Sequence, residues 1–328
     1  MFRRKNNRVV TMEVNDYAIR ALSLADDDLE TAVLGEYVLA PGIVVDDVVK
    51  DELAFFDVLK EITKAWNITK YDLRFFVPDH AVMMRVFNHP KETPLVGLKA
   101  YVEMELGRTI HLPFENPLID VYNHKGNEEE SVIFAAPAEE SIKLIQLYED
   151  VQLQPTVLDV RALSNIRFLN STSQFEPART YLIVDLSMNA VSISIYTDGN
   201  VEFLRYQPSE HPNRNWRYGT IKNGENVYTY NGDVEQYRIE INAQIYEIER
   251  ILNFYKFSLN KGEKSVDEII IMGYNPEIRY FSEQIKIIID LPLTVIDDAY
   301  VQKRYPQFNA KYVALIGLAL KGGASIGS

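Results

Sequence analysis

Two strand meanders, in separate parts of the chain, restrict the fold more than any other feature of this sequence. The first runs through three apolar stretches, 9–14, 17–24 and 31–39, and the second covers 180–206. Short polar turns separate the stretches, as expected for antiparallel strands joined by hairpins. Helical patterns and further strands follow each meander. The sequence therefore predicts a duplicated α/β layout, although the two halves share no obvious sequence identity.

A third unit is predicted between the two meanders. From His80 to about Asp150 the pattern is strand, helix, strand, strand, helix, which predicts a compact α+β unit. One helix is predicted before this unit, and a long one after the second meander, because apolar residues recur every three or four positions. The apolar residues are Val48, Phe55, Leu59, Ile62 and Trp66 in the first helix, and Val234, Tyr237, Ile241, Ile245, Ile248, Leu252 and Tyr255 in the second.

The charge balance and the lack of cysteine limit the partners and the compartment. The 328 residues carry a net charge of -13, which disfavours nucleic acid because phosphate binding needs clustered Lys and Arg. The same charge disfavours anionic lipid and favours a basic peptide partner. The chain has no cysteine, which fits a reducing cytoplasm. The longest apolar run near the end, 312–320, is far shorter than the roughly 20 residues of a membrane span, so we expect a cytoplasmic chain without membrane insertion.

Sequence motifs for catalysis are missing. The five histidines include no pair at the spacing of zinc ligands on a helix, and there is no Walker loop and no G-x-G-x-x-G segment. We therefore predict no catalytic residue and no metal site.

The middle of the chain carries a series of short motifs. They are Pro78, Arg85 and Pro90; Glu103, Glu105 and the segment LPFE; Ala135, Ala136 and Pro137; and Pro155, Asp159, Val160, Ala162 and Leu163. In their order and spacing these motifs resemble the PilM family of type IV pilus assembly proteins. That family has a strand ending in Pro that continues through an Arg to a second Pro, then a Glu-rich helix with an Ile-Pro-Phe-type end. An Ala-Ala-Pro strand end and a Pro-x-x-x-Asp-Val-x-Ala-Leu stretch follow in the family. The segment IYEIERILNFY is similar to a further family helix, at Glu247, Ile248, Arg250, Leu252, Phe254 and Tyr255.

The resemblance implies an actin-like (ribonuclease H-like) fold of two lobes with an inserted, SHS2-like α+β subdomain, as in the related cell-division protein FtsA. Lobe I would then comprise 1–79, 151–176 and 309–328, the insertion 80–150, and lobe II 177–308.

The family also implies a partner. A membrane-anchored, PilN-like protein would place its short N-terminal cytoplasmic peptide in a groove between lobe I and the insertion. The residues expected near that groove are Phe76, Met84, Val86 and Leu106. The chain would be held at the inner face of the cell membrane through this partner. Self-association, the partner's identity and the particular pilus, secretion or DNA-uptake system stay open.

The nucleotide turns of the family are incomplete in this sequence. The first turn usually reads Asp-x-Gly-x-Ser, in which the carboxylate holds a magnesium-bound water and the glycine lets amides approach phosphate. Here Glu13 stands at the Asp position and Asn15 at the Gly position, and no hydroxyl follows Asp16. Asn15 and Asp16 alone would make a hairpin turn. A like-charge pair between Asp16 and a phosphate at about 4 Å costs on the order of 4 kcal/mol at an effective dielectric near 20.

The other two turns are also altered. The second keeps Asp185 but has Ser187 in place of Gly, and the third has Gly273 followed by Tyr274 where two glycines are usual. We therefore predict a vestigial nucleotide cleft at which magnesium-ATP binds weakly or not at all. Three alternatives stay open: an ATPase that uses Glu13 and Asp185, a sugar-kinase-like phosphotransferase, and a filament-forming protein like FtsA.

Overall fold

The computed structural model describes residues 8–26, 28–123, 129–209, 215–220 and 226–321. Two five-stranded sheets dominate it, and they have the same topology. In each, an antiparallel meander is extended on its first-strand side by two parallel strands. The first sheet has the order β10-β6-β1-β2-β3, formed by Gln154–Asp159, Asp72–Phe76, Arg8–Asn15, Ala18–Ala25 and Val33–Val38. The second has the order β13-β12-β11-β16-β17, formed by Asn200–Pro208, Ala190–Thr197, Thr180–Leu186, Glu268–Met272 and Leu293–Val295.

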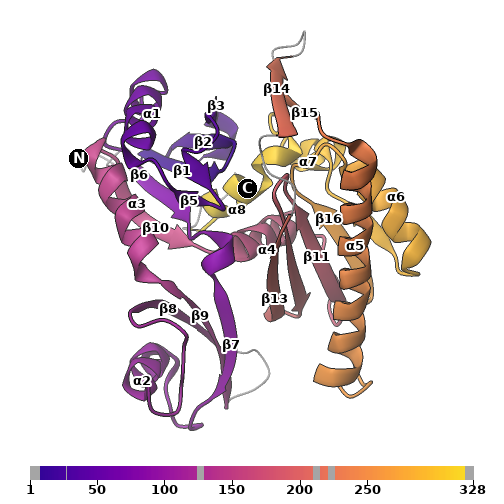
Figure 1. The fold of residues 1–328 in the computed structure, drawn as a ribbon. Helices are drawn as coiled ribbons and strands as arrows, with labels where there is room; N and C mark the ends of the chain where they lie inside the picture. Colours follow the sequence, from indigo (N-terminus) through magenta and orange to yellow (C-terminus); the bar gives the residue numbers. More distant parts are fainter. Residues whose placement is uncertain (1–7, 27, 124–128, 210–214, 221–225, 322–328) are drawn as a thin grey trace.

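The duplication predicted from the meanders is therefore confirmed (Figure 1). The domain ranges predicted above include residues 1–7 and 322–328, which lie outside the described residues.

Lobe I buries both faces of its sheet. On one face, α1 (Glu52–Ala65) and α3 (Ala138–Asp150) cover a core that contains Phe55, Phe75 and Tyr148. On the other face lie α4 (Arg161–Ser171) and the apolar α8 (Val313–Ala319). These two helices belong to a core that also takes in residues of the second sheet, such as Ile183 and Ile270. The two lobes thus share part of their interior.

Lobe II packs its other face against two helices. The long α5 (Val234–Asn253) continues into a π-helical turn, Phe254–Leu259, and α6 (Ile278–Ile288) lies beside it. The predicted apolar row of α5 is buried at Tyr237, Ile241, Ile245 and Ile248, so this helix prediction is confirmed. The short α7 (Asp298–Arg304) and the 3-10 turn Ala310–Tyr312 (η6) lead into α8.

The segment between β6 and β10 forms a separate small sheet. Its order is β7-β9-β8, formed by Met83–Asn88, Glu130–Pro137 and Pro117–Asn123. The helix α2 (Leu98–Glu105) packs on one face around Phe87, Val102 and Ile133. By contrast, α3 buries Leu144 and Tyr148 in the lobe I core. We use the name insertion for residues 83–123 and 129–137, which extend away from the two lobes in Figure 1.

Two hairpins differ from the sequence-based expectation. Val48, predicted to begin a helix, lies instead in β5 (Val48–Val49), which pairs with β4 (Val44–Val45). Both residues between these strands have positive φ, +54° and +58°, as in a two-residue hairpin turn. The second hairpin, β14 (Trp216–Thr220) with β15 (Asn226–Tyr230), lies in a stretch too polar to be interpreted from its pattern. Within the described residues, no helix has the length and apolar character that crossing a bilayer requires.

Candidate functional site: an interlobe cleft and an insertion groove

The cleft between the lobes encloses a cavity of only about 30 Å³. A space of that size holds one or two water molecules, whereas sites for drug-sized ligands measure roughly 300–1,000 Å³. Both lobes contribute to its walls. The lining residues are Glu13, Asn15, Tyr17, Arg20, Arg161, Asn165, Asp185, Ser187, Met272, Gly273, Tyr274, Ala310, Lys311, Val313 and Ala314.

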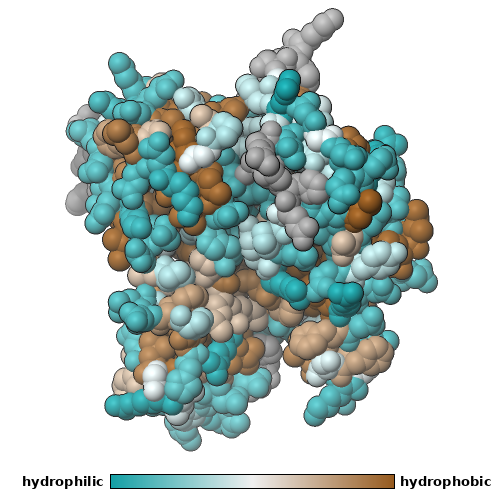
Figure 2. Space-filling model, in the orientation of Figure 1, coloured by the Kyte–Doolittle hydropathy of each residue, from teal (hydrophilic) through white to brown (hydrophobic). Residues whose placement is uncertain are grey.

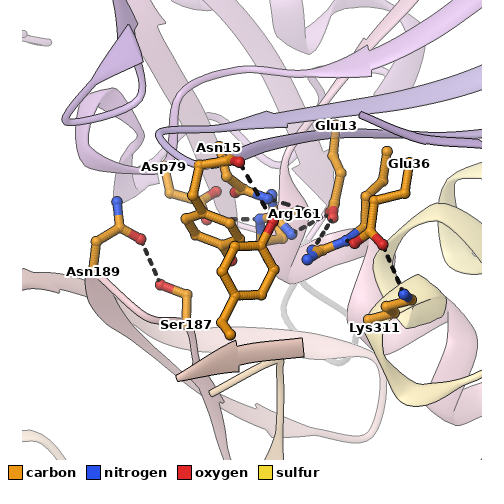
Figure 3. Close-up of polar contacts among 11 residues, drawn as sticks. Glu13, Asn15, Glu36, Asp79, Arg161, Ser187, Asn189 and Lys311 are labelled. Atoms are coloured by element: carbon orange, nitrogen blue, oxygen red, sulfur yellow. Dashed lines mark hydrogen bonds and ion pairs between the residues drawn. The ribbon is translucent and has the colours of Figure 1, made fainter. Parts of the chain in front are cut away.

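Six charged side chains form an alternating chain of ion pairs along this cleft (Figure 3). We call it the cleft network, and its order is Lys311, Glu36, Arg20, Glu13, Arg161 and Asp79. Consecutive members are joined by N–O distances of 2.9, 2.7, 3.0, 2.8 and 3.0 Å. Three cations therefore balance three anions within the protein.

The strand register explains the centre of this network. Glu13 lies directly opposite Arg20 in the β1–β2 pair, and Arg20 lies opposite Glu36 in the β2–β3 pair. Opposite charges at such cross-strand positions stabilise a sheet. Since Asn15 pairs with Ala18, the two residues of the first turn are Asp16 and Tyr17. The expected turn at Asn15 and Asp16 is therefore shifted by one residue.

Aromatic rings close the cleft around Arg20. Its guanidinium lies 4.7 Å from the ring centre of Tyr274 and 5.6 Å from that of Tyr17, within the range of cation–π attraction. Tyr228 of β15 packs edge-on against Tyr17, with ring centres 5.2 Å apart, and its hydroxyl donates to the Tyr17 carbonyl. Arg20 is 1% exposed. The β14–β15 hairpin of lobe II therefore contacts the first turn of lobe I directly.

Asp16 is turned away from the cavity and holds the β4–β5 turn. Its carboxylate accepts hydrogen bonds from the N–H groups of Asp46 and Asp47, at 3.0 and 2.8 Å. Burial, together with the charges of Asp79 and Asp16, raises the pKa of Asp47 to about 8. Burial also raises the pKa of Asp79 to about 6, although its partner Arg161 opposes this shift. Asp16 of the first turn thus stabilises the β4–β5 turn, whose two residues are also aspartates.

The second nucleotide turn of the family, at Asp185 and Ser187, and the third, at Gly273, are held by hydrogen bonds inside lobe II and to α4. The Asp185 carboxylate accepts from Asn165 at 2.7 Å, and burial raises its pKa. Ser187 donates to the Asn189 amide oxygen at 3.0 Å (Figure 3). Gly273 has φ +109°, and a Cβ there would lie 2.4 Å from the Leu186 carbonyl oxygen. Both the positive φ and the close packing require a glycine at this turn.

The structure brings most of the predicted cleft residues together. Six of the seven line the cavity, namely Glu13, Asn15, Asp185, Ser187, Gly273 and Tyr274. Asp16 does not line it. The other five members of the cleft network were not among the predicted residues: Arg20, Glu36, Asp79, Arg161 and Lys311. Arg20 and Glu36 could have been found from the hairpin register, because a two-residue first turn places Arg20 opposite Glu13.

A second and much larger cavity, about 570 Å³, lies between the insertion and lobe I. We call it the insertion groove. Figure 2 shows apolar side chains gathered where the insertion meets the lobes. Its lining residues are Val77, Val82, Lys99, Glu103, Leu106, Pro117, Leu118, Ile119, Asp120, Tyr122, Phe134, Ala135, Ala136, Leu158, Asp159, Val160, Leu163 and Lys321.

Of the four residues predicted near a partner groove, Leu106 lines it. Phe76 is 9% exposed and lies in the core shared by the lobes, with the Arg161 guanidinium 5.1 Å from its ring centre. Met84 packs against the same core, and Val86 is exposed. The structure places these three residues outside the lining of the groove.

Two lobes of one topology, facing each other across a cleft formed at their first hairpins, define the class of actin-like proteins. The family model for the type IV pilus assembly protein PilM matches residues 12–322, so the chain belongs to this family. No sequence among the curated proteins matches the chain.

Solved structures support the same fold. The PilM-PilN type IV pilus biogenesis complex matches with a TM-score of 0.72 and 16% identity, over 96% of this chain and 98% of the other. MreB5 of Spiroplasma citri bound to ADP matches with a TM-score of 0.53 and 11% identity, over 96% of each chain. A Bacteroides thetaiotaomicron protein with an actin-like ATPase fold and unknown function gives 0.51 and 10%, over 95% of this chain and 96% of that one.

Proposed function

We propose that this chain is a scaffold in the assembly of a type IV pilus or a related secretion or DNA-uptake system. Its insertion groove binds the N-terminal cytoplasmic peptide of a membrane-anchored, PilN-like partner. Through that partner the chain is held at the inner face of the cell membrane.

The contrast between the two cavities supports this proposal most directly. The groove offers about 570 Å³ lined mainly by apolar side chains, whereas the cleft offers about 30 Å³ among paired charges. Burial of apolar side chains contributes about 25 cal/mol per Å², and such a groove suits a peptide. A solved structure that matches this chain with a TM-score of 0.72 is a complex of PilM with PilN.

The charge of the chain supports a basic partner peptide. The net charge is -13, and the groove lining holds Glu103 and Asp120 beside Lys99, whereas Asp159 there is paired with Lys321. A tail with Lys or Arg near the membrane would be attracted to this surface, mainly through a faster association rate.

We also propose that the interlobe cleft has no ATPase activity. The Arg20 and Arg161 guanidiniums are paired with Glu13, which is 2% exposed, and a nucleotide that bound these guanidiniums would have to displace it. Breaking one buried ion pair costs about 3–5 kcal/mol. The protein's own charges therefore compete with the nucleotide.

The peptide proposal is tested with the N-terminal cytoplasmic segments of membrane proteins encoded by neighbouring genes, by calorimetry with purified protein. We expect micromolar binding that Leu106→Glu abolishes. Met104→Glu is the matched control, because Met104 is 66% exposed on the same helix and does not line the groove. If no cytoplasmic tail binds, or if both variants bind equally well, the peptide does not occupy this groove.

The nucleotide proposal has its own test. Calorimetry with magnesium-ATP should show no binding in the micromolar range, and phosphate release should stay at background. Micromolar affinity together with turnover that Asp185→Ala removes would establish an active ATPase instead.

A further inference from the structure

Strand β8 has a free edge. In the order β7-β9-β8, β9 is the central strand, and within the described part of the chain β8 pairs with β9 alone. A strand edge presents N–H and C=O groups that can pair with another extended chain.

The insertion groove reaches that edge. Successive side chains of a strand point to opposite faces of the sheet. The groove is lined by Pro117 and Ile119 from one face of β8, and by Leu118, Asp120 and Tyr122 from the other. Residues 134–136 of the neighbouring strand β9 also line it, so the groove extends over β9 as well. Because residues from both faces of β8 take part, the groove includes the free edge of this strand.

Two hydrogen bonds identify the backbone groups that face the groove. The Asn116 carbonyl accepts from the Ala138 N–H at 3.1 Å, on the β9 side of the strand. The Val121 N–H donates to the side chain of Asp120 at 3.0 Å, so it does not take part in the β8–β9 ladder. Because backbone groups alternate in direction along an antiparallel pair, the N–H and C=O of Ile119 also point to the free edge.

The part of the lining that lobe I contributes suits an extended chain. It consists of Val77 and the consecutive residues Leu158, Asp159 and Val160 where β10 ends. Asp159 is paired with Arg167 and with Lys321, the latter at 2.9 Å. Lobe I therefore contributes mainly apolar side chains to the groove, and the buried carboxylate among them is already neutralised.

We propose that the partner's tail binds in the groove as an added strand along β8, with main-chain hydrogen bonds to Ile119. This rests on the proposed function and adds the binding mode. Strand addition takes its affinity from main-chain hydrogen bonds and its specificity from pockets for alternate side chains. Asp120, bonded to the Val121 N–H, limits pairing at that end of the edge, in the way that charged residues protect exposed strands.

The experiment uses a series of tail peptides, each N-methylated at one successive residue, and measures their affinity for the full chain by calorimetry. N-methylation removes one main-chain donor without changing the side chain. We expect affinity to fall at least ten-fold at alternate residues and to change less than two-fold at those between. The Ile119 amide should exchange its hydrogen at least ten-fold more slowly when the unmodified peptide is bound.

The protein side of the pairing is tested with Ile119→Pro. Proline is tolerated on an edge strand where its missing N–H faces outward. Val121→Pro is the matched control, because both side chains pack against the insertion core, and the Val121 N–H is already used by Asp120. We expect Ile119→Pro to weaken peptide binding at least ten-fold and Val121→Pro less than three-fold.

The outcomes separate the two proposals. Tight binding without an alternating N-methyl pattern, and without protection of the Ile119 amide, leaves the proposed function intact and overturns strand addition. Failure of every tail to bind overturns both. If Ile119→Pro instead dissociates a dimer seen by sedimentation, the edge pairs with a second copy of the chain and strand addition by the partner is wrong.

Discussion

At the scale of single residues, Arg20 is the central cation of the cleft network. It is almost fully buried, pairs with two carboxylates and lies against two tyrosine rings. Although burial raises the pKa of Glu36, its partners Arg20 and Lys311 outweigh burial and hold that pKa below the ordinary value. The charged side chains of the cleft network are therefore paired with one another within this chain.

Arg20→Met should destabilise the protein strongly. Glu13 and Glu36 would keep their buried charges and lose a shared cation, which costs about 3–5 kcal/mol. Arg205→Met is the control, since Arg205 pairs with Glu247 at 2.9 Å but is 47% exposed, and exposed pairs contribute about 0–1 kcal/mol. Chemical denaturation of both variants measures the difference. Equal losses of unfolding free energy in the two variants would show that burial does not increase the contribution of the Arg20 ion pairs.

Asp47 should make stability depend on pH. Its pKa is about 8 in the folded protein, against roughly 3.9 in the unfolded chain. The folded state thus holds a proton that the unfolded state releases, so the contribution is complete below about pH 4 and is lost as pH rises to about 8. Asp47→Asn keeps the N–H bonded to Asp16 and suits the left-handed backbone there.

The expected result is that Asp47→Asn gains stability over the native chain as pH increases from 4 to 8, by about 1–2 kcal/mol at pH 8.5 after allowance for solvent screening. Denaturant titrations across this pH range measure the gain. Asp46→Asn is the control, because Asp46 has the same backbone conformation and is exposed. A gain that does not change with pH would contradict the assignment to Asp47.

At the scale of elements, the strands and helices with clear periodicity and clear turns could be predicted from the sequence. The meanders and α5 follow from alternating and helical spacing, and both are confirmed. Val48 was misread because its spacing to Phe55 and Leu59 is helical, while the turn before it uses two aspartates in place of the usual Asn-Gly. The β14–β15 hairpin is specified by tertiary contacts, since Trp216 and Tyr228 are buried against lobe II and the first turn of lobe I.

The site was only partly predictable for the same reason. Family resemblance located the three turns, and six of seven residues there share one cavity. It could not show that Arg161 and Lys311, 148 and 298 positions after Glu13, would reach the same network. The groove depends on how the insertion is oriented to lobe I, which no local pattern encodes.

At the scale of the whole molecule, the two lobes and the insertion differ in how they are stabilised. The core shared by the lobes joins both large sheets through α4 and α8. The insertion has its own small core, in which five residues are buried: Phe87, Val102, Ile110, Ile133 and Ala135. Segments with few buried apolar contacts open at lower free energy than the rest of a protein. Although Val132 and Phe134 of β9 also reach the shared core, we expect the insertion, which carries the proposed partner site, to be the less stable part.

We therefore expect the insertion to open without global unfolding. In native-state hydrogen exchange, β9 amides should exchange through an opening that costs less free energy than that seen for β11. Ile133→Ala, in the insertion core, should speed exchange in β7–β9 alone, whereas Ile183→Ala, in the shared core, should lower the global stability by about 2–5 kcal/mol. If β9 and β11 exchange with the same opening energy, and Ile133→Ala lowers both equally, the insertion and the lobes form one cooperative unit. Binding of a partner peptide would then stabilise the whole chain, and not the insertion first.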